Sequence, residues 1–323
     1  MVPADLRPPS TQARGNDIIS FQAVVSRLRM GEPYYPTVGD ELRRGDYPTA
    51  HAFNWRTPLV FKTAASLPDN LVVALWMLLG FLMCCATVVV TLAQPVPVVV
   101  TAVLIQVGAV TAMDPRAAVV MGEAWSGVLM GLSVCAYVRG RPKVGMPLGL
   151  LALFVRELAA PYCVACTVMA LFARRWREAA AWIAGAAAYA AYYGWHLTNI
   201  WQQQRPSDLS HTSPWLQFGG LAFVLLTVRF HRWLYVSPKP MPALALTLVV
   251  AGATNASTPL HVRVTSAVYL AFFLVAGQPF NQYWGLMAWP TWALACGYGL
   301  HGILESLNVV ARGRLRPREA GAR

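Results

Sequence analysis

The sequence is poor in charged residues. Asp, Glu, Lys and Arg make up 12% of its 323 residues, whereas soluble domains carry roughly 25%. Hydrophobic residues make up 56%, and the mean hydropathy is +0.45. This balance excludes an ordinary soluble domain and a disordered chain. It predicts an integral membrane protein that crosses the bilayer several times, with 12 Trp and 12 Tyr available for the interfaces.

Acidic residues are the scarcer of the two charge classes. The chain has 14 of them against 26 Lys and Arg, a formal net charge of +12. Such a charge can indicate nucleic-acid binding. Here the basic residues stand in short clusters between apolar runs, as loop charges that set membrane topology do. We therefore predict a lipid bilayer as partner and no nucleic acid.

Cysteine is also scarce, and residues 1–14 are not expected to be a signal peptide. The six cysteines all lie inside apolar runs, where they are expected to behave as small buried hydrophobes. Cys163 and Cys166 form a C-x-x-C, but no second cysteine pair or nearby His completes a metal site. Residues 1–14 contain no apolar core of signal-peptide length. The sequence therefore predicts neither a disulfide framework nor a zinc site.

One polar stretch, residues 15–61, stands out from the apolar remainder. Ile18, Phe21, Val25 and Leu28 recur at helical spacing, which predicts a short amphipathic helix in the membrane interface. The part from Glu32 to Pro58 is expected to be irregular, because it is rich in proline and glycine.

The rest of the chain divides into apolar runs. Residues 145–172 form one run interrupted by charges and Pro161, so we predict two half-length helices meeting near Pro161. The other runs are Leu71–Ala93, Val96–Met113, Ala117–Val138, Ala179–Leu197, Leu216–Val228, Met241–Ala253, Val264–Ala276 and Gly285–Ile303. The predicted fold is all-α, a polytopic membrane helical bundle of about 9–10 spans. Its expected parts are a juxtamembrane segment (1–66), the bundle (67–310) and a basic tail (311–323).

The basic clusters predict the orientation. The positive-inside rule places 139–143, 174–177 and 229–239 in the cytoplasm. Residues 1–66 are then extracytoplasmic. Because no apolar helix precedes residue 70 to carry this segment across, we expect a first membrane helix upstream of the chain; an inverted topology is the alternative. The side of the C-terminal tail stays open.

Several motifs carry a resemblance to a known family. They are G-E-P-Y-Y at 31–35, F-N-W-R-T-P-L at 53–59, E-A-W-S-G-V-L-M at 123–130, F-V-R-E-L at 154–158 and G-Q-P-F-N-Q-Y-W-G at 277–285. Together they resemble polytopic GT-C glycosyltransferases of the mannosyl- and arabinosyltransferase kind. The resemblance implies an active site at the extracytoplasmic surface of the plasma (inner) membrane. It also implies a sugar donor on a polyprenyl phosphate and a carboxylate base in the first loop.

The resemblance points to Asp17 as that base. Family members often carry two acidic residues there, whereas this chain has Asn16-Asp17, which leaves a requirement for a divalent metal open. The alternative role for Asp17 is to stabilise a helix N-terminus. Asp40, Glu41 and Asp46 are the other candidate bases.

Candidate substrate-binding residues follow from the same motifs. Arg56 is the first candidate for the donor phosphate, because arginine binds phosphate with paired charge-assisted hydrogen bonds; its alternative is an interfacial contact with lipid headgroups. Weaker phosphate candidates are Arg43, Arg205, His211, His261 and Arg263. Asn54, Tyr34, Tyr35, Trp55 and Trp284 are candidates for contacts with the sugar, or else for an aromatic belt.

Charged residues inside apolar runs are expected to pair. A charge within the bilayer is costly and marks a function or an ion pair. Adjacent residues of a helix face different ways, so Arg156 and Glu157 each need a separate partner, and Glu123 is the candidate for Arg156. Asn281, Tyr283 and Trp284 are expected to support the site.

The leading hypothesis is therefore an enzyme that transfers a sugar from a lipid-linked donor to an extracytoplasmic acceptor. The alternatives are a transporter or lipid-handling protein without catalysis, and an inactive relative shortened at its N-terminus. Transporters commonly show repeated halves, and the sequence shows no internal repeat.

Overall fold

The computed structural model describes residues 16–210, 216–238 and 240–314. In this part of the chain every regular element is a helix, and β pairing is limited to one isolated bridge between Leu216 and Ala276. The prediction of an all-α fold is confirmed.

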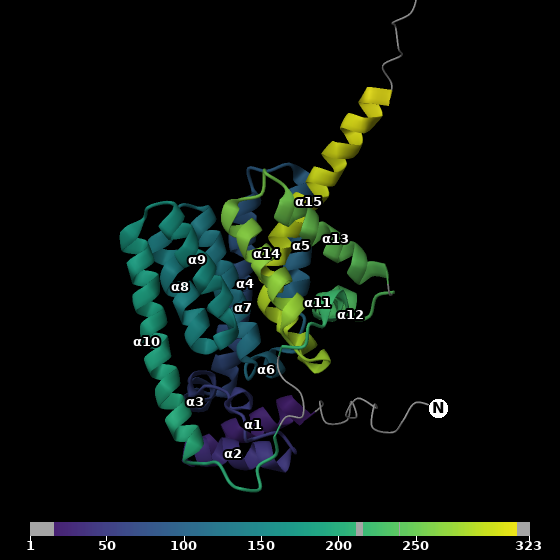
Figure 1. The fold of residues 1–323 in the computed structure, drawn as a ribbon. Coiled ribbons are helices and arrows are strands. Elements are labelled where there is room, and N and C mark those ends of the chain that lie inside the picture. The colour runs from purple at the N-terminus through teal and green to yellow at the C-terminus, as the bar shows by residue number, and fades with distance from the viewer. Residues whose placement is uncertain (1–15, 211–215, 239, 315–323) are drawn as a thin grey trace, which may run out of the picture.

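The helices form a bundle with a polar layer across one end (Figure 1). The layer contains α1 (Asn16–Arg29), α2 (Tyr34–Arg44), the short η3 (Ala52–Asn54) and α3 (Pro58–Ser66). We call this end of the bundle, the lower end in Figure 1, the layer end. The other helices are α4 (Asp69–Thr91), α5 (Val96–Val110), α6 (Pro115–Ala118), α7 (Gly122–Val138), α8 (Pro142–Val155), η4 (Glu157–Ala159), α9 (Ala160–Phe172), α10 (Trp176–Trp201), α11 (Gly220–Arg229), α12 (Arg232–Tyr235), α13 (Pro240–Thr254), α14 (Leu260–Val275), η5 (Pro279–Trp284) and α15 (Gly285–Arg314).

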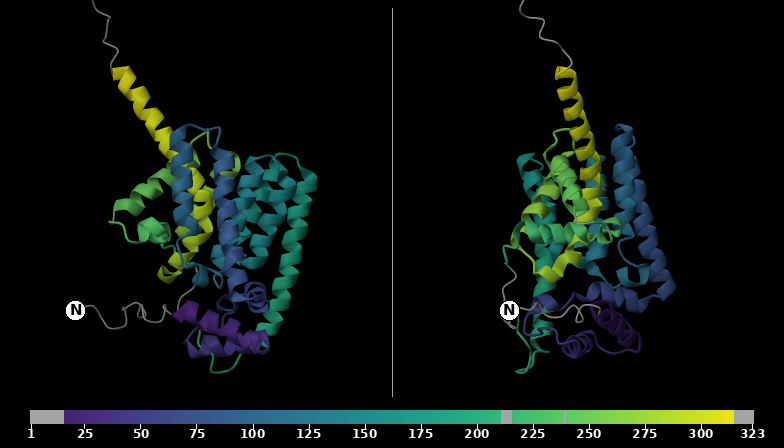
Figure 2. Two further views of the ribbon diagram at one scale, coloured as in Figure 1. Left: turned by 180° about the vertical axis from the view of Figure 1, so that it is seen from behind. Right: turned by 90° about the vertical axis from the view of Figure 1, so that its right-hand side faces the viewer.

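Successive helices run up and down the bundle. The turn at 139–141 between α7 and α8 and the turn at 173–175 between α9 and α10 lie at the far end, opposite the polar layer (Figure 2). The start of α14 lies there too, because the ring of His261 stacks on Tyr137 with 4.4 Å between centroids. α15 runs from the layer end through the core and extends beyond the far end.

Between α10 and α14 the chain makes one broken passage, so Leu216–Val228 does not cross by itself as predicted. At its start, the Gln217 backbone N–H donates to Val275 O, at the layer end of α14. Further along, His231 Nε2 bonds Ile105 O, inside α5, at 2.9 Å. At its end, Asn255 Nδ2 donates to Tyr298 O at 3.1 Å, well along α15. α11 and α13 thus each cover part of the height, with α12 at the break.

This broken passage corrects the prediction that the three basic clusters share one face. Residues 229–238 lie partway up the bundle, so the three basic clusters do not share one face. The loop at 255–259 joins the turns at 139–141 and 173–175 at the far end. The described end of the basic tail, residues 311–314, lies beyond that same end as a continuation of α15, so the helix continues past the predicted boundary at 310.

The prediction of irregular chain from Glu32 to Pro58 is wrong for its first half. α2 begins directly after Pro33, and Pro36 falls in its first turn, where backbone N–H groups need no helical partner. Gly39 belongs to this helix for a packing reason, since a Cβ there would lie 2.7 Å from the ring of Trp55. Proline and glycine here shape a helix instead of preventing one.

The prediction of two half-length helices in 145–172 is confirmed, but their junction is not at Pro161. Pro161 lies in the first turn of α9, a position that tolerates proline. The break falls at Arg156, whose backbone is extended, with φ −152° and ψ 123°. One helix of the described chain, α4, is long and apolar enough to cross a membrane by itself; α5, α8, α9, α11, α13 and α14 are apolar but shorter.

Candidate active site

The densest group of buried charges lies where the polar layer meets the bundle. Glu123, in the first turn of α7, has a side chain only 1% exposed. Its Oε1 lies 2.9 Å from Nη1 of Arg56, in the layer, and 2.9 Å from Nε of Arg156, at the break after α8. One carboxylate thus joins three elements distant in sequence. The predicted pairing of Glu123 with Arg156 is confirmed.

Arg156 also pairs with its neighbour, which corrects a prediction. Nη1 of Arg156 lies 2.5 Å from Oε1 of Glu157. Adjacent side chains diverge in a helix, but the extended backbone at Arg156 ends α8 and lets the two meet. The break is therefore the local feature that brings Glu157 into the cluster.

Arg56 is buried and largely engaged. Its Nη2 donates to the hydroxyl of Tyr283 at 3.1 Å, and its guanidinium lies 5.5 Å from the centre of the Phe21 ring. Burial is the largest single influence and lowers the pKa of Arg56, but the charge of Glu123, together with Tyr283, Glu157 and Asp17, outweighs it and raises this pKa above its ordinary value. The approach of Nη1 to Glu123 does not follow a hydrogen-bond direction, and both Arg56 Nη1 and Glu123 Oε2 are buried without a hydrogen-bond partner in the described part.

Asp17 lies at the edge of this cluster. It belongs to the first turn of α1, and its Oδ1 accepts a hydrogen bond from the hydroxyl of Tyr47, on the loop after α2. Its charge acts on Arg56 and Tyr283. Burial, and next the charge of Asp17, raise the pKa of Tyr47, which keeps this hydroxyl protonated as a donor. Asp17 therefore combines the helix-terminus position with a place in the cluster.

The weaker phosphate candidates are not brought to the cluster. Nε of Arg43 donates to Asp208 at 2.7 Å, and this bond lowers the pKa of Asp208 to about 2. Arg205 donates to Asp40 at 3.1 Å. His261 lies at the far end of the bundle, near the start of α14, and Arg263 follows it on that helix. His211 falls outside the described residues.

The other candidate carboxylates serve the layer itself. Oε1 of Glu41, on a side chain 4% exposed, lies 2.8 Å from both Arg27 and Arg44. Asp40 lies near Arg27, Arg43 and Arg205. Asp46 is exposed on a turn with positive φ. Glu41 and Asp40 are thus occupied by arginines, and Asp17 is the candidate carboxylate that lies against the buried cluster.

The aromatic candidates have structural partners. Tyr34 donates to Arg56 O at 2.6 Å, and Tyr35 bonds Nδ1 of His196 at 2.9 Å. Trp55 is buried and its carbonyl bonds Nε2 of His196 at 3.2 Å. Asn54 donates to Pro48 O, Asn281 donates to the Tyr283 hydroxyl, and Trp284 packs among Phe223 and Phe272. Of these side chains, Asn281 reaches the charged cluster, because the Tyr283 hydroxyl that it bonds also accepts from Arg56.

Sequence analysis missed two residues of this region. Tyr47 holds Asp17, and His196, fully buried on α10, fixes α2 and the 52–55 turn to the bundle. A His in the Tyr- and Trp-rich run 192–196 was the available signal. Among the residues described, no group of three or more His, Cys, Asp and Glu side chains could hold a metal ion.

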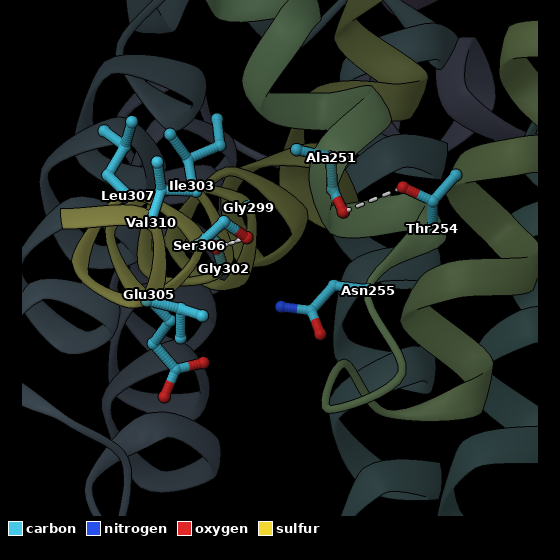
Figure 3. Close-up of a pocket in the computed structure, with 11 residues that line it drawn as sticks. Ala251, Thr254, Asn255, Gly299, Gly302, Ile303, Glu305, Ser306, Leu307 and Val310 are labelled. Atoms are coloured by element: carbon cyan, nitrogen blue, oxygen red, sulfur yellow. Dashed lines mark hydrogen bonds between the residues drawn. The ribbon is translucent and has the colours of Figure 1, made fainter. Parts of the chain in front are cut away.

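A large cavity lies at the far end of the bundle and has different chemistry. It measures about 810 Å³ and lies between the end of α13 and the extension of α15 (Figure 3). Its polar side chains are occupied, since Thr254 and Ser306 bond their own helices and Asn255 bonds Tyr298 O. Nothing in its lining resembles a reaction centre.

Comparison with known proteins gives no relative: no family model, no curated protein and no solved structure matches this chain.

Proposed function

We propose that this chain is a membrane glycosyltransferase that moves a sugar from a polyprenyl-phosphate donor to an extracytoplasmic acceptor. The observation that carries the proposal is the position of Asp17. Its carboxylate is held by Tyr47 at the edge of a largely buried cluster of two carboxylates and two guanidiniums, those of Glu123, Glu157, Arg56 and Arg156. Closely spaced buried charges of this kind are typical of functional sites.

A membrane setting explains the outer surface of the bundle. Large apolar side chains are exposed on most outer helices, for example Phe81, Leu104 and Val164 at 59–65%, and such a surface is unfavourable in water. We propose that the bundle is polytopic, with the polar layer at the extracytoplasmic face. The basic turns of the far end then lie in the cytoplasm, as the positive-inside rule requires.

The proposed reaction is an inverting displacement. Asp17 accepts the proton of an acceptor hydroxyl as its oxygen attacks the anomeric carbon of the donor sugar. The bond from that carbon to the phosphate oxygen breaks, and polyprenyl phosphate leaves with the electron pair. Arg56 carries more N–H groups than Tyr283 and Glu123 use, so its positive charge can stabilise the leaving phosphate.

The test is turnover by Asp17→Asn. Asparagine keeps an oxygen for the Tyr47 hydroxyl, so the fold should persist, while loss of the base should lower turnover by roughly 100-fold or more. Purified protein would be assayed with synthetic polyprenyl-phosphate mannose and arabinose and a panel of sugar acceptors. Asp114→Asn is the matched control, because Asp114 caps α6 and its side chain bonds the backbone N–H of Arg116, and Asn also caps helices.

Two outcomes would contradict the proposal. Full activity in Asp17→Asn would remove Asp17 as the base. Binding of donor without turnover by the unmodified protein, under any of these acceptors, would favour the lipid-handling alternative.

A further inference from the structure

Helix α10 carries a group of aromatic rings beside the charged cluster. Tyr189 and Tyr193 stack at 5.8 Å between centroids, and Tyr192 and Trp195 stack at 5.9 Å. Phe154, at the end of α8, lies against Tyr189 at 5.4 Å and against Tyr192 at 5.5 Å. In Figure 1 this part of α10 runs along the edge of the bundle toward the polar layer. The rings therefore lie between the membrane-facing side of α10 and the break after α8.

Glu157 stands at the inner edge of these rings. Its side chain is 20% exposed, which makes it more accessible than Glu123 and Arg156, the other two charged groups joined at the break. One oxygen is held by Arg156, which fixes the carboxylate in place. Its charge acts on the hydroxyls of Tyr189 and Tyr193 and on the ring of His196.

The hydroxyl of Tyr189 points to a ligand. Tyr189 Oη is buried, and no group in the described part of the chain bonds it. A buried hydroxyl without a partner is unfavourable, and such groups in native proteins call for an unseen partner.

The side chains around Tyr189 and Glu157 restrict the chemical class of the ligand. A phosphate is disfavoured, because Glu157 is an acceptor and Arg156 is already occupied by two carboxylates. A quaternary ammonium would suit the ring faces but cannot bond the Tyr189 hydroxyl. A neutral sugar ring satisfies both needs, since its C–H face packs on an aromatic face and its hydroxyls donate to a carboxylate and bond a phenol.

We propose that Tyr189, Tyr193 and Glu157 form a subsite for a neutral pyranose or furanose ring. The inference rests on the proposed function, which supplies two sources for such a ring, the donor and the acceptor. Tyr193 gives the stacking face, and Tyr189 and Glu157 give the hydrogen bonds. The subsite lies on the opposite side of Arg156 from Glu123 and is distinct from the base Asp17.

The first test is direct binding, which needs no turnover. Saturation-transfer NMR would follow methyl mannopyranoside and methyl arabinofuranoside on the purified protein. Tyr189→Phe should weaken the sugar that binds by about 3- to 10-fold, the worth of one hydrogen bond, without lowering thermal stability. Tyr192→Phe is the matched control, because it removes the hydroxyl of a neighbouring ring on the same helix, and it should leave sugar affinity unchanged.

Two further measurements tell whether the bound ring belongs to the donor or to the acceptor. They also distinguish failure of the subsite proposal from failure of the glycosyltransferase proposal. Tyr193→Leu should raise KM for one substrate alone, the donor or the acceptor, and so identify which ring occupies the subsite. Sugar binding with these variant effects in a protein that never turns over would sustain the subsite and sink the glycosyltransferase proposal. Absence of sugar binding, equal loss in Tyr192→Phe, or binding of choline in place of sugar would overturn the subsite.

Discussion

Glu123 shows how single residues determine this fold. A carboxylate 1% exposed is expensive to bury unless it is paired. It receives two guanidiniums on one oxygen, from Arg56 in the polar layer and Arg156 in the bundle. The same contact that satisfies its charge also fixes the layer to the bundle, so the cost of burying these charges determines where the site forms.

The prediction at this scale concerns Glu123→Gln. The amide leaves two buried guanidiniums without this counter-charge, and removing one partner of a buried pair typically costs about 3–5 kcal/mol. The detergent-solubilised Glu123→Gln protein should therefore unfold at a markedly lower temperature than the unmodified protein. Glu305→Gln is the control, because Glu305 is 64% exposed and pairs with His301 at the surface, where such pairs are worth about 0–1 kcal/mol. Equal effects of the two changes would contradict a structural role for Glu123.

Some of these residue contacts were predictable from sequence and others were not. The contact between Glu123 and Arg156 was predictable, because a charge in an apolar run needs a partner. The Arg156–Glu157 contact was not, because it depends on a break in the helix that the apolar pattern does not reveal. The contact of Arg43 with Asp208 joins positions 165 residues apart, and nothing local in the sequence marks it.

At the scale of elements, small residues set the distances between helices. A Cβ on Gly127 of α7 would lie 2.2 Å from the backbone oxygen of Leu286 in α15. A backbone atom cannot rotate aside as a side chain can. Close helix contact of this kind is a common way of packing membrane helices, which gain little from the hydrophobic effect among lipids.

Gly127→Ala should accordingly destabilise the protein by about 1–3 kcal/mol, the usual cost of overpacking. The matched control is Gly194→Ala in α10, where a Cβ meets nothing within 4 Å. That change should be neutral or stabilising by about 0.5–1 kcal/mol, because alanine favours a helix more than glycine does. Thermal unfolding of the two variants checks the contrast, and a stable Gly127→Ala protein would mean that α7 and α15 are further apart.

The sequence predicted most helices but not how each one runs. Apolar runs located α4, α5 and α7 because length and hydropathy suffice for that. α2 was missed, since its prolines lie in or before the first turn, where they are tolerated. α11 was taken for a crossing, although its 10 residues reach about 15 Å. Composition does not say whether a short apolar helix completes its passage.

At the scale of the whole molecule, the broken passage determines at which end of the bundle the last helix leaves. If Leu216–Val228 and Met241–Ala253 each crossed the bundle, the basic C-terminal tail would leave on the side of the polar layer. Because α11 and α13 share one passage, the end of α15 leaves at the far end, with the turns at 139–141 and 173–175. The basic turns and the arginines at the end of α15 thus lie at one end of the molecule, and the polar layer lies at the other.

With the polar layer in its proposed extracytoplasmic position, this arrangement predicts the outcome of cysteine labelling in intact cells. Lys62→Cys, exposed on α3 of the polar layer, should react with a membrane-impermeant maleimide added outside. Arg141→Cys and Ala256→Cys, exposed at the far end, should react only after the membrane is opened. The unmodified chain, with its six cysteines buried or partly buried, gives the background.

Ala256→Cys is the decisive position, because two full crossings by α11 and α13 would place it outside, whereas one broken passage places it with Arg141. Labelling of Ala256→Cys from outside, with Arg141→Cys protected, would therefore contradict the observed path of the chain between α10 and α14 in the membrane. Labelling of both from outside, with Lys62→Cys protected, would instead invert the proposed orientation and place the Asp17 site in the cytoplasm.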